Sequence, residues 1–267
     1  MSGVFSRVLV ALVGLPVVLG MVWLGGWWLF GLVAAAAVIA VHEFVTMARP
    51  LRPLAPAAYV GTILALVGAQ EGGVVWMLGG FLTVFLVAFA LNAVAETRAP
   101  STAAIGATVL GAAWIGFGLG HLVLLRRMHD EPRVLAFTVL LTVFAADTFA
   151  YFGGRMIGRR KLAPTLSPGK TWEGFAVGSI VGMFVSFVAL YAYRDHYLQM
   201  WQAVILGLVV VLAAAAGDLF ESMLKRDMQV KDTGRLLGGH GGVLDRVDAL
   251  LFASAAAFYL VLGFNYV

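Results

Sequence analysis

The sequence predicts an all-α, polytopic integral membrane protein that forms a single membrane-embedded domain over residues 1–267. Hydrophobic residues make up 61% of the chain, charged residues make up only 12%, and the mean hydropathy is +0.94. A soluble globular domain carries roughly a quarter charged residues. No stretch of soluble-like composition is long enough to form a second domain, so we expect one helical bundle.

Apolar runs long enough to cross a bilayer recur along the chain. A membrane-spanning helix needs about 20 mostly apolar residues. The first run continues into "WWLFGLV" without a small-residue cleavage site, so we interpret it as a helix and not as a signal peptide. We predict about nine spanning helices, at approximately 7–25, 27–47, 56–70, 73–94, 102–125, 133–154, 172–193, 199–224 and 243–264.

The distribution of lysine and arginine predicts the orientation of these helices. Cytoplasmic loops of membrane proteins carry an excess of both residues. If the N-terminus is inside, the loops with most lysine and arginine fall on the inner side of the membrane. Only the outer loop "RRMHDEPR" argues against this orientation. We therefore expect a multi-pass protein of the cell membrane with its N-terminus inside and its C-terminus outside. The polar loops 155–171 and 225–243 would face the cytoplasm, helices 1–125 would form a scaffold with a lipid cavity, and 133–267 would hold the catalytic helices.

Charge is concentrated in two segments that flank the seventh and eighth predicted helices. Eleven charged residues lie between Asp218 and Asp248, and five basic residues lie between Arg155 and Lys170. The positive-inside rule explains the basic segment, but it does not require the aspartates of the mixed one. Carboxylates, basic side chains and glycines together are typical of a site that binds Mg²⁺ and a polyphosphate. Ionisable groups that are buried in a membrane protein or lie at the membrane interface are costly, so they favour a functional site.

Several other kinds of site are excluded by the residues. The chain has no cysteine, so a thiolate nucleophile or a thiolate metal site is impossible. The "GKT" of "SPGKTWEG" is not a P-loop, because Pro164 stands where that motif requires glycine. The net charge of +4 reports topology and lipid headgroups, and we expect no nucleic-acid partner. His42 and Glu43 are not part of H-E-x-x-H, and we expect them to pack or to line the cavity.

The pattern S-x-L-K-R-x₄-K-D-x-G-x₂-L-G-x-H-G-G-V-x-D-R-V-D, from Ser222 to Asp248, resembles the signature of the phosphatidate cytidylyltransferases, or CDP-diacylglycerol synthases. A looser similarity covers "RVLVALVGLPVVL", "DTFAYFGGRMIGRRKLAPTLSPGKTWEG" and "AAGDLFESMLKR". The resemblance implies a membrane enzyme that joins CTP and phosphatidate into CDP-diacylglycerol and pyrophosphate at a cytoplasm-facing site. It also implies dependence on Mg²⁺, a monovalent cation such as K⁺ at the site, and a homodimer.

The signature also implies roles for individual residues. The metal ligands would be Asp218 and Asp245, with Asp248 as a third candidate that could instead pair with Arg246 or Lys231. Asp232 would orient its neighbours. Phosphate groups would be held by Lys225, Arg226, Lys231 and Arg246, and the turn facing them would be formed by His240, Gly241 and Gly242. Ser222 follows Asp218 by one helical turn on the same face and would contact substrate.

The segment "SPGKTWEG" resembles a second stretch of the family. Ser167, Lys170 and Thr171 would contact the nucleotide, and Glu173 would pair with Lys170. A Pro–Gly turn with Thr171 capping the next helix is an alternative that is compatible with binding there. Asp147, inside the sixth predicted helix, would belong to the site or pair with an arginine after it, Arg155 or Arg159.

The reaction needs no nucleophile from the enzyme, because phosphatidate already carries an anionic oxygen. Catalysis would depend on positioning and electrostatic stabilisation of two polyanions. A CTP-dependent lipid kinase of the polyprenol type is an alternative that also combines many helices with a cytoplasmic CTP site. A transporter is a weaker alternative, because it predicts charges spread through the membrane midplane and repeated halves.

Overall fold

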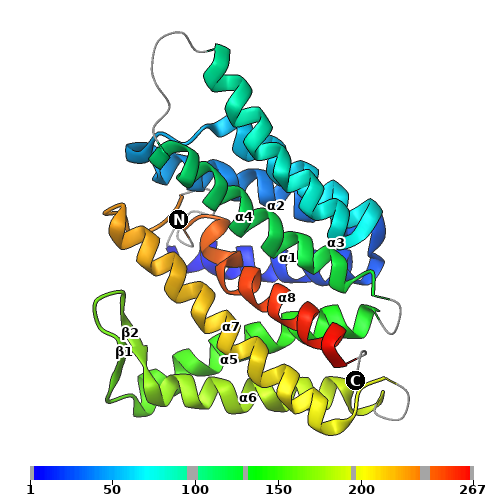
Figure 1. Cartoon of the computed structure of the whole chain (residues 1–267). Coiled ribbons are helices and arrows are strands. Elements are labelled where there is room, and N and C mark those ends of the chain that lie inside the picture. Colours follow the sequence, from blue (N-terminus) through cyan, green and yellow to red (C-terminus); the bar gives the residue numbers. More distant parts are fainter. Residues whose placement is uncertain (1–2, 95–101, 129–131, 194–196, 235–240, 265–267) are drawn as a thin grey trace. The chain divides into compact units, whose positions relative to one another are not determined.

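The computed structural model describes residues 3–94, 102–128, 132–193, 197–234 and 241–264, and its regular structure consists of helices and one short β-hairpin (Figure 1). Within these residues, seven helices are long and apolar enough to cross a membrane. This agrees with the predicted all-α, multi-pass class. The count of about nine spans and the orientation stay predictions.

The chain divides into two compact units. Unit 1 comprises Met1–Leu124 with Asp227–Val247, and unit 2 comprises Leu125–Arg226 with Asp248–Val267. The polar segment after Asp227, which the sequence analysis grouped with the C-terminal helices, therefore clusters with the N-terminal ones. The last helix, α8 (Leu244–Phe264), begins in unit 1 and continues in unit 2.

Unit 1 is built from helices that pack through apolar and aromatic side chains. Its elements are α1 (Gly3–Leu24), α2 (Gly26–Met47), the 3₁₀ turn η1 (Arg49–Leu51), α3 (Ala55–Val94) and α4 (Thr102–Leu125). Phe44 of α2 meets Trp114 of α4 edge-on, with ring centroids 6.3 Å apart. Phe81 of α3 packs against Phe117 of α4 at 4.6 Å. Aromatic contacts therefore link α4 to α2 and to α3.

Helix α3 is a helical hairpin. Gly73 has φ 76° and ψ −157°, a conformation that breaks the helix and that L-residues with a side chain avoid. On either side of it the two arms touch closely, because a Cβ atom on Gly68 or Gly80 would lie 2.2 Å from the carbonyl oxygen of Trp76 or Leu64 respectively. The break falls at the boundary predicted between the third and fourth apolar segments.

Unit 2 contains α5 (Pro132–Ile157), β1 (Lys161–Ala163), β2 (Ser167–Thr171), α6 (Trp172–Tyr191), α7 (Met200–Asp227) and most of α8. Small residues let its helices approach each other closely, as is typical of membrane bundles. A Cβ atom on Gly178 of α6 would lie 2.5 Å from the carbonyl oxygen of Ala146 on α5. A Cβ atom on Gly217 of α7 would lie 2.6 Å from the carbonyl oxygen of Asp248 on α8.

The β-hairpin between α5 and α6 was not predicted. Its strands are antiparallel, with Lys161 opposite Thr171 and Ala163 opposite Ser167. The pairing orders the loop that the sequence analysis interpreted only as a basic cytoplasmic segment. It also places Lys170 and Thr171 at the end of a strand, immediately before α6.

Candidate active site

An ion pair joins the hairpin of unit 2 to helix α7. The Lys170 ammonium lies 2.5 Å from the Asp218 carboxylate, and both side chains are about one-third exposed. Asp147 of α5 interacts electrostatically with both residues. The structure therefore brings together Lys170, Asp218 and Asp147, which the sequence had marked in three separate segments. It does not pair Asp147 with Arg155, whose guanidinium donates to the Tyr151 hydroxyl.

The predicted pairing of Lys170 with Glu173 is wrong. Both carboxylate oxygens of Glu173 accept hydrogen bonds from backbone N–H groups, that of Arg159 at 3.0 Å and that of Arg160 at 3.1 and 3.2 Å. Thr171 caps α6, since its hydroxyl oxygen accepts from the N–H of Gly174 at 3.1 Å. This confirms the capping role that was considered for Thr171.

A buried acidic group lies one turn further along α7. Glu221 is 1% exposed, and the Lys225 ammonium donates to it at 2.6 Å. Asp248 of α8 is also buried, and its carboxyl group interacts electrostatically with Glu221 and with Asp218. Two buried carboxyl groups that interact in this way favour a proton or a cation between them, because two bare carboxylates repel. Ser222, beside them on α7, is buried as well.

The end of α7 is attached to the hairpin. The Arg226 side chain donates from Nε to the carbonyl oxygen of Leu166 at 3.2 Å. Leu166 lies in the turn before Ser167, the first residue of β2. Arg226 therefore positions the strand that carries Lys170, and its guanidinium remains exposed at the surface.

Glu43 organises the signature segment of unit 1. This residue, in the last turn of α2, is 5% exposed. Its carboxylate accepts from the backbone N–H of Val243 at 3.0 Å and of Leu244 at 2.8 Å, with the Thr233 hydroxyl at 3.5 Å. The first N–H groups of a helix have no partner within the helix, and a carboxylate there also complements the helix dipole. An acid from α2 therefore caps the start of α8.

Asp245 belongs to the same segment and forms hydrogen bonds with other residues in it. One oxygen of its carboxylate, Oδ2, accepts from the N–H and the hydroxyl of Thr233 and from the N–H of Gly242. The N–H of Gly242, predicted to face phosphate, is thus already engaged. Gly241 has φ +78°, which favours glycine, and a Cβ atom there would lie 2.6 Å from Asp245.

The remaining predicted residues of the signature lie at its surface. The side chains of Lys231, Asp232 and Arg246 are exposed. His240 lies outside the described residues. No role for Glu221 was predicted from the sequence, and only packing or cavity lining was predicted for Glu43. The only local signal for Glu221 was its position three residues after Asp218, and nothing near Glu43 in the sequence pointed to the signature.

The oxygen ligands of unit 2 suit a hard cation such as Mg²⁺. The described residues contain no ready-made group of three or more His, Cys, Asp or Glu side chains that could hold a metal ion. Mg²⁺ is commonly held by one or two carboxylates together with substrate phosphates and water, and not by a cage made only of protein. Asp218 and Asp248 could supply these one or two carboxylates. A cation bound there would offset the repulsion between Asp248 and the neighbouring carboxyl groups of Glu221 and Asp218.

Comparison with known proteins gives one consistent result. A profile of the cytidylyltransferase family matches residues 5–264. A phosphatidate cytidylyltransferase of Pseudomonas aeruginosa is 34% identical over 93% of this chain and 93% of its own length. One of Mycobacterium tuberculosis H37Rv is 31% identical over 94% of this chain and 79% of its own length. One of Haemophilus influenzae is 44% identical over 43% of this chain and 41% of its own length.

Proposed function

We propose, since the chain belongs to the cytidylyltransferase family, that it transfers the cytidylyl group of CTP to phosphatidate. A phosphate oxygen of phosphatidate would attack the α-phosphorus of CTP. The bond from that phosphorus to the oxygen bridging to the β-phosphate would break, so that CDP-diacylglycerol and pyrophosphate form. The observation that carries this proposal is the group of Lys170, Asp218, Glu221, Lys225 and Asp248 in unit 2.

The basic residues of this group would neutralise phosphate charge. Lys170 and Lys225 are each oriented by a neighbouring carboxylate, at 2.5 Å and 2.6 Å. An ammonium held this way loses little freedom when it binds a phosphate oxygen, and charge-assisted hydrogen bonds are stronger than neutral ones. Arg226 would add a third cation while its Nε keeps the hairpin in place. Together they would stabilise the charge that develops on the leaving pyrophosphate.

The metal in this proposal is Mg²⁺, held by Asp218 and Asp248. It would supply charge neutralisation at the α-phosphate of CTP when bound. A second cation such as K⁺, a homodimer and a site that faces the cytoplasm belong to the same proposal. The first two rest on the family resemblance, and the orientation rests on the lysines and arginines of the loops.

The products of the reaction test the proposal. Purified protein in detergent is supplied with phosphatidate and with CTP labelled in either the cytosine or the γ-phosphate, with and without Mg²⁺. We expect Mg²⁺-dependent label from cytosine in the lipid and label from the γ-phosphate in pyrophosphate. Transfer of the γ-phosphate to a lipid, with release of CDP, would instead identify a lipid kinase.

Substitutions then locate the site. Asp218→Ala should lose at least about a hundredfold in activity, because it removes a metal's contribution to transition-state stabilisation. Asp245→Ala, predicted from the signature to behave alike, tests the segment of unit 1. Asp227→Ala is the matched control, since Asp227 is an exposed acid at the end of α7. Full activity in Asp218→Ala would remove this residue from the metal site.

A further inference from the structure

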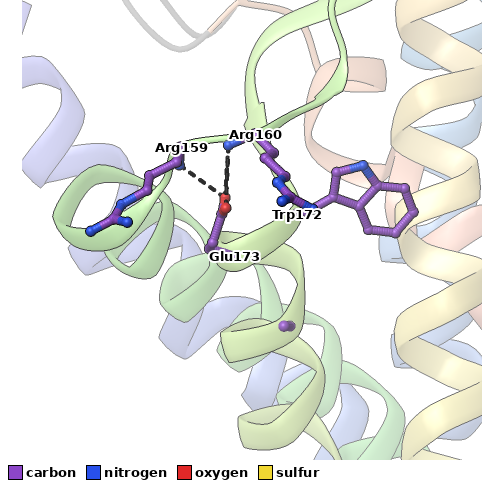
Figure 2. Close-up of a pocket in the computed structure, with 5 residues that line it drawn as sticks. Arg159, Arg160, Trp172 and Glu173 are labelled. Atoms are coloured by element: carbon purple, nitrogen blue, oxygen red, sulfur yellow. Dashed lines mark hydrogen bonds between the residues drawn. The ribbon is translucent and has the colours of Figure 1, made fainter.

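A pocket in unit 2 lies beside the start of α6. It has a volume of about 650 Å³ and is lined by Arg159, Arg160, Trp172, Glu173 and Ala176 (Figure 2). Ligand pockets in proteins typically have volumes of about 300–1,000 Å³. The transfer reaction proposed above uses none of these residues, so the pocket is open to a separate role.

Hydrogen bonds hold the backbone around this pocket in place. Glu173 accepts from the N–H groups of Arg159 and Arg160, and the N–H of Trp172 donates to the carbonyl oxygen of Arg160 at 3.0 Å. Figure 2 shows the Glu173 carboxylate pointing at this backbone, while the Arg159 side chain extends away from it and the Arg160 side chain extends toward Trp172. The linker between α5 and β1 is therefore held by backbone groups, and neither guanidinium is needed to hold it.

The two guanidinium groups are available to an anion. In the part of the chain that the structure describes, no ion pair joins either arginine to an acid, although Arg160 feels the charge of Glu173. Both side chains are exposed. The pocket keeps a net positive charge, because two arginines and one glutamate line it. Guanidinium groups bind phosphate oxygens through two parallel hydrogen bonds, which makes a phosphate group the best-matched anion.

The other wall of the pocket is apolar and belongs to a spanning helix. Trp172 is the first residue of α6, is 54% exposed, and has its ring set edge-on to Phe175. Ala176 lies one turn further into the same span. Tryptophan at the end of a spanning helix prefers the membrane–water interface, and basic residues beside such an end attract anionic lipids. A ligand of this pocket would meet cations on one side and the edge of the bilayer on the other.

We propose that Arg159, Arg160, Trp172 and Ala176 form a binding site for the phosphate and glycerol region of an anionic phospholipid. The phosphate lies at the Arg160 guanidinium, with Arg159 adding positive charge to the lining, and the glycerol and first acyl carbons lie against Trp172 and Ala176. A nucleotide fits less well, because the apolar wall continues into the span and not toward water. The lipid phosphate has two sources, a phosphodiester such as phosphatidylglycerol and the phosphomonoester phosphatidate.

Lipid retention measured by native mass spectrometry tests this site without any turnover. The purified protein in detergent is titrated separately with phosphatidylglycerol, phosphatidate and phosphatidylcholine. We expect one anionic lipid to be retained over phosphatidylcholine, and Arg159→Gln or Arg160→Gln to weaken that binding about fivefold. Phosphatidate bound well above phosphatidylglycerol would identify the substrate lipid as the source, and equal binding would identify anionic lipid in general.

Two matched variants distinguish binding in this pocket from nonspecific attraction of anionic lipid to basic residues. Arg155→Gln removes one cation four residues earlier, at a position outside the pocket lining, and should retain lipid like the wild type. Ala176→Trp leaves the charge unchanged but fills the pocket, and should reduce retention. An equal loss in Arg155→Gln, no loss in Ala176→Trp, or displacement of the lipid by CTP alone would overturn the proposal. Because binding is measured in the absence of CTP turnover, the result does not depend on the transfer reaction.

Discussion

The carboxylate of Glu43, near the end of α2, accepts a hydrogen bond at 2.8 Å from the backbone N–H of Leu244, the first residue of α8. This contact joins residues 201 positions apart and ties the conspicuous glycine-rich segment of the sequence to an unremarkable apolar helix. Because its carboxylate binds the backbone of this segment, we regard Glu43 as a positioning residue.

Replacing Glu43 should loosen the signature segment. Glu43→Ala leaves the buried N–H groups of Val243 and Leu244 without their acceptor, at a cost of about 1–3 kcal/mol for each unsatisfied group. We expect a lower unfolding temperature in detergent and faster tryptic cleavage after Lys231. Glu43→Gln, which keeps one carbonyl oxygen, should be intermediate. The matched control is Glu71→Ala, an exposed acid of unit 1, and equal cleavage in the two alanine variants would contradict the capping role.

The ion pair between Lys170 and Asp218 should contribute to catalysis more than to stability. Both side chains are partly exposed, and such pairs contribute about 0–1 kcal/mol to folding. We expect Lys170→Met and Asp218→Asn to change the unfolding temperature little while each loses activity. The double variant should remain inactive, since both charges act on the substrates. Recovery of activity in the double variant would show that the pair serves only to hold the hairpin.

The pair of Glu221 and Lys225 should behave in the opposite way. Glu221 is 1% exposed, so Lys225→Met leaves a buried carboxylate without its cation, which typically costs about 3–5 kcal/mol. Adding Glu221→Gln should restore most of the stability, because the carboxylate that Lys225 pairs with is then removed as well. Thermal unfolding of the single and double variants measures this. Activity should stay low in the double variant if Lys225 binds phosphate, and full activity there would leave the lysine a structural role only.

Gly242 should tolerate no side chain. A Cβ atom at this position would lie 2.5 Å from the Glu43 carboxylate, and overpacking of this kind costs about 1–3 kcal/mol. Gly242→Ala should therefore lower the unfolding temperature and expose the segment to trypsin. Gly263→Ala is the matched control, because nothing lies within 4 Å of a Cβ atom there. A stable Gly242→Ala variant would show that Glu43 is free to move aside.

The helices and the family were predictable from the sequence because both are determined by residues that lie close together in the chain. Apolar runs mark the spanning segments, and Gly73 falls between two of them. The spacing from Ser222 to Asp248 carried the resemblance that the match over residues 5–264 confirms. The β-hairpin was missed because its strands have only three and five residues and show no alternating pattern. Pro164 directly follows the first strand, and Pro168 lies in the second.

The partners within the candidate site were harder to predict, since they come from distant parts of the chain. From the sequence, Glu173 was the expected partner of Lys170. Asp147 had Arg155 or Arg159 as alternatives, and Asp248 had Arg246 or Lys231. Only the close packing of α7 and α8 at Gly217 decides that Asp248 meets Glu221. Charge patterns therefore identified the chemistry, while packing determined which side chains share it.

The turn at Gly73 has a consequence for the biogenesis of the protein. The arms of α3, residues 55–72 and 74–94, are about 27 and 31 Å long at 1.5 Å per residue, close to the thickness of a bilayer's hydrocarbon core. Two arms of this length that fold back on each other can enter a bilayer as one helical hairpin, with both ends on the same side. Glu71, beside the turn, is the only charged residue in α3. Insertion of the pair would therefore carry one acidic side chain for two apolar helices.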